Sequence, residues 1–234
     1  MKDIKDYRAS ELKNYVIGNI MVICVITGAF DFVFDGLSTY ASYSKSDILL
    51  DFASSIMTEL IGVGIISSII YIYVFIIDSI LPGNLKFFIC YFGKHQPGYT
   101  IFEDMKKEVK DDRFTRDQVI KKYQGIYDLL EDIGSHELRR KKQNAEWYKI
   151  YQKHRDEGMI SVANRDYLLA RDLCVISLII LGIYIALCAL TPLTHNCEVL
   201  AFIVIEFLVT NLAMRSKGRR LAYNVIAADV SMDS

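Results

Sequence analysis

The chain has 234 residues, of which 52% are hydrophobic, and a formal net charge of −1. These totals suit a soluble domain as well as a membrane protein, but the apolar residues are concentrated in blocks and the charges lie between them. This distribution excludes an ordinary soluble domain and is typical of a membrane protein. It lacks a nucleic-acid-binding signature, so we expect no nucleic-acid partner.

Four apolar blocks have about the length that crosses the hydrocarbon layer, which takes about 20 residues. The blocks are Asn14–Phe30, Leu60–Ile77, Leu173–Cys197 and Val199–Met214, the last broken only by Glu206. With a few residues of extension they predict spans at about 14–34, 56–80, 172–192 and 197–214.

The placement of basic residues predicts the topology. Of the 27 lysine and arginine residues, 26 fall on one side of these spans, and the other side holds only Lys45. Basic residues near a span resist translocation, so the rich side is cytoplasmic. We therefore expect a multi-pass protein of the inner (plasma) membrane with both termini in the cytoplasm.

The predicted fold class is all-α, with four transmembrane helices as two hairpins and a helical cytoplasmic insert. The expected parts are an N-terminal tail and first hairpin (1–81), the insert (82–170), and a second hairpin with a basic tail (171–234). Within a part of about 90 residues the core is thin. We therefore expect the insert to pack against the membrane face or against copies of itself.

Two helices are predicted in the insert. Thr115 and Gln118 form a capping box, and the first helix ends at Gly134. The second begins after Ser135 and ends near Gly158. Its apolar side is expected to carry Leu138, Trp147, Ile150 and Tyr151. From Ile160 the chain should run directly into the third span.

The aromatic segment Leu85–Phe92 precedes these helices and is bracketed by Lys86 and Lys94. Aromatics between lysines suit the headgroup layer of a membrane. A buried strand or helix of the insert is the alternative, and the sequence does not decide between the two.

Four polar residues stand out in or near the spans. Glu206 lies near the middle of the fourth span, where an exposed carboxylate costs roughly 2.5 kcal/mol or more. It either lines a cation path or, when protonated, bonds another helix as structural glue. Glu59 opens the second span near the outer surface and could join acids at a pore mouth. Asn19 and Asn211 lie at comparable inner depths and are expected to bond across helices.

Two basic clusters are candidate binding surfaces. The first comprises Arg139, Arg140, Lys141 and Lys142, and the second comprises Arg215, Lys217, Arg219 and Arg220. The second should hold anionic lipid headgroups, at about 1 kcal/mol per basic residue near the surface. The first could also hold lipid headgroups, or could bind a partner, a phosphorylated signal or, less expected, a nucleic acid. A solvated helix face is the other interpretation.

Catalytic constellations are missing from the sequence. The four histidines are scattered, and no HExxH, GxSxG, Walker-type loop or CxxC pair occurs. Three of the five cysteines fall inside expected spans, where they serve as small packing residues. We therefore expect no enzyme, no cofactor and no metal site.

The last third of the chain resembles small bacterial membrane proteins, some of them encoded with antiphage systems. The resemblance rests on Asn164–Tyr167, Arg171–Asp172 and, after the last hairpin, Arg215, Arg219, Arg220 and Tyr223. The piece Thr58–Gly62 is similar to second spans in such proteins. The layout is also similar to the membrane subunit of the Kiwa defence system. The resemblance implies a sensor or effector at the inner membrane during phage attack.

These features lead to two functional hypotheses. The first is a homo-oligomeric gated pore or membrane-perturbing protein, because four thin spans hardly enclose an aqueous path in one copy. The second is a non-conducting scaffold that recruits a soluble cytoplasmic partner through the insert. A small transporter is less well supported, because the hairpins show no inverted repeat.

Overall fold

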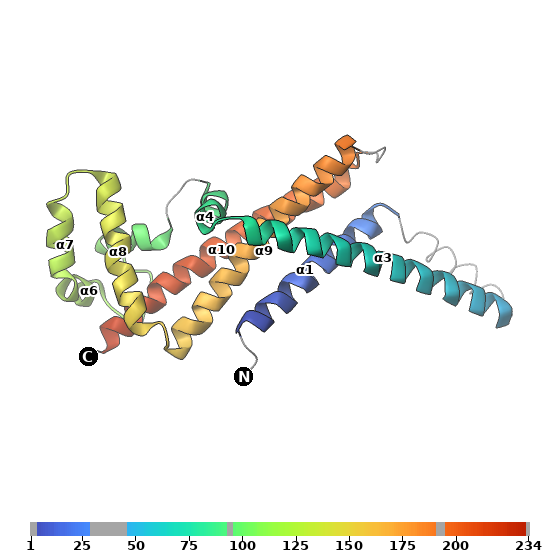
Figure 1. The fold of residues 1–234 in the computed structure, drawn as a ribbon. Helices are drawn as coiled ribbons and strands as arrows, with labels where there is room; N and C mark the ends of the chain where they lie inside the picture. Colours follow the sequence, from blue (N-terminus) through green and yellow to red (C-terminus); the bar gives the residue numbers. More distant parts are fainter. Residues whose placement is uncertain (1–3, 29–45, 93–95, 191–194, 233–234) are drawn as a thin grey trace. The chain divides into compact units, whose positions relative to one another are not determined.

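The structure is a computed structural model that describes residues 4–28, 46–92, 96–190 and 195–232, with the side chains of 4–9, 46–56 and 58–60 outside the description. Helices account for the regular structure in these ranges, and no strand occurs in them, which confirms the all-α prediction. The helices are α1 (Ile4–Ile26), α3 (Ser46–Ile80), α4 (Gly83–Tyr91), α5 (Ile101–Lys107), α6 (Arg116–Lys122), α7 (Gln124–Glu131), α8 (His136–His154), α9 (Gly158–Leu190) and α10 (Cys197–Ser231), with a short 3₁₀ turn at Pro97–Tyr99 (Figure 1).

Three of these helices are long and apolar enough to cross a membrane, which is consistent with a membrane protein. They are α3 from Ile61 to Ile80, α9 and α10. The expected first span begins within α1, but its residues beyond 28 lie outside the described ranges, as does the outer loop with Lys45. The count of four spans and their pairing into hairpins therefore stay predictions.

The chain divides into two compact units. One comprises residues 1–82 and 172–209, and the other comprises 83–171 and 210–234. Helices α9 and α10 each contribute residues to both units. The domain boundaries expected from the sequence stay a prediction, although they grouped residues 210–234 with the second hairpin.

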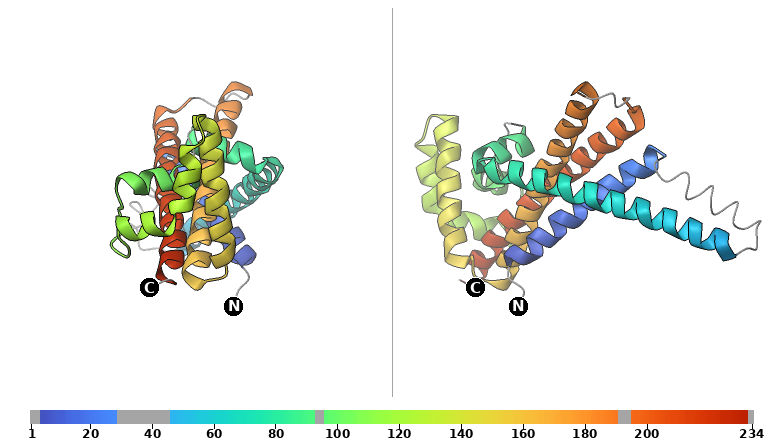
Figure 2. Two further views of the ribbon diagram at one scale, coloured as in Figure 1. Left: turned by 90° about the vertical axis from the view of Figure 1, so that its left-hand side faces the viewer. Right: turned by 45° about the vertical axis from the view of Figure 1, so that its right-hand side comes forward.

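In the first unit, α1 packs against α3, and both helices leave large apolar side chains exposed. On α3, eleven of the described residues from Met57 to Ile80 have large apolar side chains that are exposed, including Ile65, Ile72 and Phe75. Exposed aliphatic and aromatic side chains of this density suit contact with lipid or with further membrane helices. The figures show the two helices crossing each other at an angle (Figures 1 and 2).

Helix α10 is much longer than the expected fourth span. Asn196 begins it by accepting the backbone N–H groups of Glu198 (2.8 Å) and Val199 (3.2 Å), which caps the first turn. The apolar stretch ends at Met214, yet the helix continues to Ser231. Every residue from 221 to 230 is buried. The segment read from the sequence as a basic tail is thus a core helix of the second unit.

The insert folds around this extension of α10. Its core joins α5, α6 and α7 to the end of α10, and it comprises Ile101, Phe102, Met105, Phe114, Val119, Tyr123, Tyr127, Leu130, Ala222, Tyr223, Ile226, Ala227 and Val230. The Phe102 ring meets Tyr123 and Tyr127 edge-on, with ring centroids 5.4 and 6.2 Å away. The insert therefore completes its thin core with its own chain, a partner that the sequence analysis did not foresee.

The predicted helices of the insert are largely confirmed. The Thr115 side chain and the Gln118 side chain form the expected capping box at the start of α6. The helix is not continuous, however, because it is interrupted at Tyr123, which ends α6 and begins α7. Helix α8 begins after Ser135 as predicted. Leu138 was wrongly placed on its apolar side, since this residue is 58% exposed.

A buried carboxylate ties α6 and α8 to α10. Asp229 is 5% exposed, and its oxygens accept hydrogen bonds from Tyr123 Oη (2.8 Å) and lie beside His154 Nε2 (2.9 Å). Lys122 and Lys153 each place Nζ 3.1 Å from the same carboxylate. Several donors around one buried carboxylate compensate for the loss of its hydration.

We expect Asp229→Ala to lower the free energy of unfolding of the second unit by about 3 kcal/mol, because it leaves buried cationic and hydroxyl donors without their acceptor. Chemical denaturation of the detergent-solubilised protein, followed by fluorescence of Trp147, measures this directly. Trp147 is the chain's single tryptophan and lies in the same unit. The control is Lys149→Ala, an exposed residue paired with Glu146, with an expected loss below about 1 kcal/mol. Equal losses in the two variants would contradict the assignment.

Candidate anion-binding groove

Helix α4 marks the level at which the apolar stretches of α9 and α10 end. Asn211 Nδ2 donates to the Cys90 carbonyl oxygen (2.6 Å), and Cys90 Sγ donates to the Arg171 carbonyl oxygen (3.7 Å). Two aromatic side chains in and directly after α4 are exposed, Phe88 by 64% and Phe92 by 58%. The exposed aromatic side chains suit the headgroup-layer interpretation, whereas the buried Lys86, Cys90 and Tyr91 suit the alternative of a helix packed within the insert, so both interpretations stay open.

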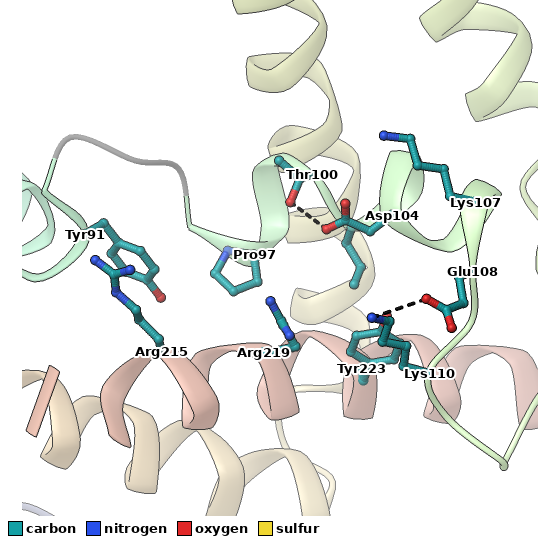
Figure 3. Close-up of a pocket in the computed structure, with 11 residues that line it drawn as sticks. Tyr91, Pro97, Thr100, Asp104, Lys107, Glu108, Lys110, Arg215, Arg219 and Tyr223 are labelled. Atoms are coloured by element: carbon teal, nitrogen blue, oxygen red, sulfur yellow. Dashed lines mark hydrogen bonds and ion pairs between the residues drawn. The ribbon is translucent and has the colours of Figure 1, made fainter. Parts of the chain in front are cut away.

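A basic groove opens next to α4 in the second unit. Arg215, Arg219 and Tyr223 recur at four-residue spacing on α10 and so form one stripe along the helix. Lys107, the last residue of α5, and Lys110, from the segment that follows it, line the same cavity of about 400 Å³ (Figure 3). The other lining residues are Tyr91, Pro97, Thr100, Ile101, Asp104 and Glu108.

A second hollow of about 680 Å³ adjoins the first and shares Lys110, Arg215, Arg219 and Tyr223 with it. Its remaining lining adds two more arginines and comprises Asp111, Arg113, Met159, Ser216, Arg220 and Asn224. Together the two hollows form one continuous basic surface, which we call the groove.

The carboxylates that line the groove already interact with other side chains of the protein. Glu108 pairs with Lys110 at 3.2 Å. Asp111 receives two hydrogen bonds from the Arg113 guanidinium, at 2.6 and 2.8 Å, and these bonds hold the pKa of the Asp111 carboxyl below its usual range. Asp104 accepts the Thr100 hydroxyl at 2.9 Å.

The arginines on α10 are not neutralised in this way. Within the described ranges, no carboxylate lies at ion-pair distance from Arg215, Arg219 or Arg220. The Arg215 guanidinium lies over the Phe92 ring (5.5 Å to the centroid), and its buried Nε makes no hydrogen bond. The groove therefore carries an excess of positive charge next to an apolar surface, where electrostatic interactions are strengthened.

A close helix contact holds the groove's wall in place. A side chain at Gly218 would bring its first carbon 2.7 Å from Tyr91 Oη and 2.9 Å from the Tyr167 ring, so any larger residue there would require these tyrosine side chains to shift. One residue earlier, Lys217 Nζ pairs with Asp166 of α9 at 3.0 Å. These contacts turn Lys217 away from the main groove and leave Arg215 and Arg219 to line it.

The other predicted basic cluster lies apart from the groove, on α8. Arg139 donates to the Ile133 carbonyl oxygen (2.8 Å), Lys141 pairs with Glu137 (2.7 Å) and Lys142 pairs with Glu146 (3.1 Å). Arg140 is half-buried on the same helix. Basic residues tied to their own and neighbouring turns favour the interpretation as a helix surface over a binding site.

Glu206 has a partner within its own chain. Tyr15 Oη donates to Glu206 Oε2 (2.9 Å) and also lies 2.8 Å from Ser177 Oγ, so one hydroxyl joins α1, α9 and α10. This arrangement is the one expected of structural glue. Asn19 donates within its own helix, to the Tyr15 carbonyl oxygen (3.0 Å).

Asn211 instead bonds across helices, to α4, as described above. Glu59 lies in α3, but its side chain is outside the described set. In the part of the chain that the structure describes, no group of acidic, histidine or cysteine residues is arranged to hold a metal ion.

Comparison of this chain with protein-family models, with curated proteins and with solved structures finds no match.

The α10 side of the groove could be predicted from the sequence, but its other basic residues could not. Lys107 ends α5, and Lys110 and Arg113 are spaced irregularly between α5 and α6, so no local pattern links them to residues about 100 positions later. The one available signal was the run of four basic residues between 106 and 113, with few apolar residues among them.

The Tyr15 bond makes a testable prediction about the first unit. We expect Tyr15→Phe to destabilise the membrane helices by about 0.6 to 1.7 kcal/mol, the range for hydrogen bonds between membrane helices. Loss of helical circular dichroism in a titration with sodium dodecyl sulfate measures the effect. Tyr73→Phe is the matched control, because Tyr73 is 60% exposed on α3. If both variants unfold at the same detergent fraction, the hydroxyl contributes nothing.

Proposed function

We propose that this chain is a multi-pass inner-membrane sensor and effector, with both termini in the cytoplasm, that converts an input at its cytoplasmic unit into a change among its membrane helices. The observation that carries the proposal is the order of polar contacts along α10. From its start to its end this helix carries Glu206, Asn211, Arg215 and Asp229. Glu206 accepts a hydrogen bond from α1, Asn211 donates one to α4, Arg215 lines the groove and Asp229 lies in the core of the second unit.

The spacing of these residues makes α10 suitable as a connector. Glu206 and Arg215 are nine residues apart on an unbroken helix, which corresponds to about 14 Å along its axis. When a ligand in the groove moves α10, the hydrogen-bonded backbone of the helix therefore transmits this movement to the Glu206 carboxylate. The bond from Tyr15 to Glu206 is the contact that such a movement would strain.

The output that we favour is a pore or a perturbation of the membrane by a homo-oligomer that acts in bacterial antiphage defence. The Tyr15–Glu206 bond then belongs to a closed state, because a carboxylate held by a neighbouring helix is not free to line a water-filled path. Opening would require this bond to break or to be exchanged for water.

The alternative is a non-conducting scaffold that recruits a soluble partner. It is favoured by the surface of α8, where Leu138 and Tyr148 are 58% and 51% exposed beside charged residues. A scaffold of this kind would show no flux under any condition and would retain a cytoplasmic protein in a pull-down with the full chain.

The two functions predict different behaviour in liposomes. For a pore, we expect Tyr15→Phe to raise the basal potassium flux about three- to twentyfold over wild type, because the closed state loses one interhelical bond of about 0.6 to 1.7 kcal/mol. Glu206→Gln should change cation selectivity, and Tyr73→Phe should match wild type. Flux is measured with a potassium-sensitive dye in proteoliposomes, with light scattering to report the oligomeric state. Wild type and variants that are all silent would leave the scaffold as the function.

A further inference from the structure

We propose that the groove binds a phosphate group, carried either by a lipid headgroup or by a soluble phosphate compound. The proposal deepens the proposed function, since it names the chemical class of the sensor's input. It rests on the contacts of the groove and is tested by binding alone. A negative flux experiment would therefore not exclude phosphate binding, and a negative binding experiment would not exclude a pore.

The first argument is the balance of charge. The main cavity is lined by four cationic side chains and two carboxylates. One carboxylate already pairs with Lys110, and the other accepts the Thr100 hydroxyl. Arg215 and Arg219 have no carboxylate at ion-pair distance among the described residues. With four cationic side chains against two carboxylates, the cavity keeps an excess of positive charge and therefore favours an anion.

The second argument is the kind of donor. Arg215 and Arg219 lie one turn apart, about 6 Å along the helix axis. Figure 3 shows the Arg215 guanidinium beside Tyr91 and the Arg219 guanidinium beside Pro97, both on the cavity side of α10, so a group with several acceptor oxygens can contact both. Guanidinium groups bind phosphate oxygens in pairs of hydrogen bonds, whereas a single carboxylate offers fewer acceptors to such a cluster. Lys107 lines the same cavity and adds a further positive charge.

The third argument is size. A cavity of about 400 Å³ lies within the range of small-molecule sites, roughly 300 to 1,000 Å³, and is too small to enclose a nucleic-acid duplex. The adjoining hollow extends it past Arg113 and Arg220. The groove can therefore hold a phosphate and still leave room for the group that the phosphate is attached to.

The fourth argument concerns the source of the phosphate. Arg215 is the first charged residue after the apolar stretch of α10, and it lies over Phe92 at the exposed aromatic edge of α4. This is the depth at which lipid phosphates lie. The cavity also extends to Tyr223, two turns further along the helix and away from the apolar stretch, so a soluble phosphate compound is the second candidate source.

The experiment measures binding by full-length protein in a neutral detergent through the unfolding temperature reported by Trp147. This tryptophan donates from Nε1 to the Ala222 carbonyl oxygen (3.5 Å), next to Tyr223 of the groove. Sodium pyrophosphate is the soluble probe. Dioctanoyl phosphatidic acid is the lipid probe, with dioctanoyl phosphatidylcholine as its zwitterionic reference. Sodium chloride at equal ionic strength controls for general salt effects.

We expect at least one probe to raise the unfolding temperature of the wild type, and the double variant Arg215→Gln/Arg219→Gln to bind it at least about tenfold more weakly, because two charge-assisted contacts are lost. The matched control is Lys141→Gln/Lys149→Gln, which removes the same charge from α8 and should bind like wild type. Arg219→Lys should recover part of the affinity, since it keeps the charge but loses the forked geometry.

The outcomes separate the sources and can overturn the proposal. Binding of pyrophosphate alone identifies a soluble ligand, binding of phosphatidic acid alone identifies a lipid, and binding of both supports the shared phosphate chemistry. Arg219→Gln alone, at an exposed position, serves as the test if the double variant does not fold. The proposal is wrong if neither probe stabilises the wild type, or if the arginine variants bind as tightly as the α8 control.

Discussion

The structure depends on one constraint, which is that α10 does not break where its apolar stretch ends. In hydrocarbon every backbone N–H and C=O group must be bonded within the helix, and the end of the apolar layer is the first place where the chain could turn. Here it does not turn, because the residues after Arg220 continue in helical conformation and are buried. One helix that is long and apolar enough to cross a membrane thereby also forms the wall of a groove and part of a core.

This constraint explains how a small helical insert becomes a folded unit. Helices α5, α6 and α7 contain seven or eight residues each, too few to be stable in isolation. They gain their stability by burying aromatic residues such as Phe102 and Tyr127 against α10. Asp229 restricts how α6 and α8 pack against α10, because a buried carboxylate surrounded by donors has few alternative positions. The groove lies on the side of α10 that this core leaves open.

Local signals in the sequence predicted local structure well. The capping box at Thr115, the start of α8 after Ser135 and the direct passage from the insert into α9 are all set by residues close together in the chain. The all-α class followed from the same periodicity. The interruption at Tyr123 was missed, because the apolar spacing runs on through that position and gives no sign of a break.

Features that depend on distant residues were not predictable in the same way. The segment from Leu221 to Val230 follows a basic cluster, so a hydropathy argument ends the fourth span at Met214 and reads the rest as a tail. Ten consecutive residues with Asp229 as the only charge were the available sign that this segment is buried. Lys107 and Lys110 line the same cavity as Arg215 and Arg219 only because of the fold of the whole second unit.

The most direct test of this account is the accessibility of spin labels placed along α10 in proteoliposomes. The exposed positions Ile205, Leu208 and Leu212 should collide with oxygen dissolved in the lipid. Labels at the exposed positions Ser216 and Arg220 should instead collide with a water-soluble nickel complex, with one helical period running through the whole series. Nickel accessibility at Leu208, or a loss of helical period between Leu212 and Arg220, would contradict the claim that a single helix leaves the membrane unbroken.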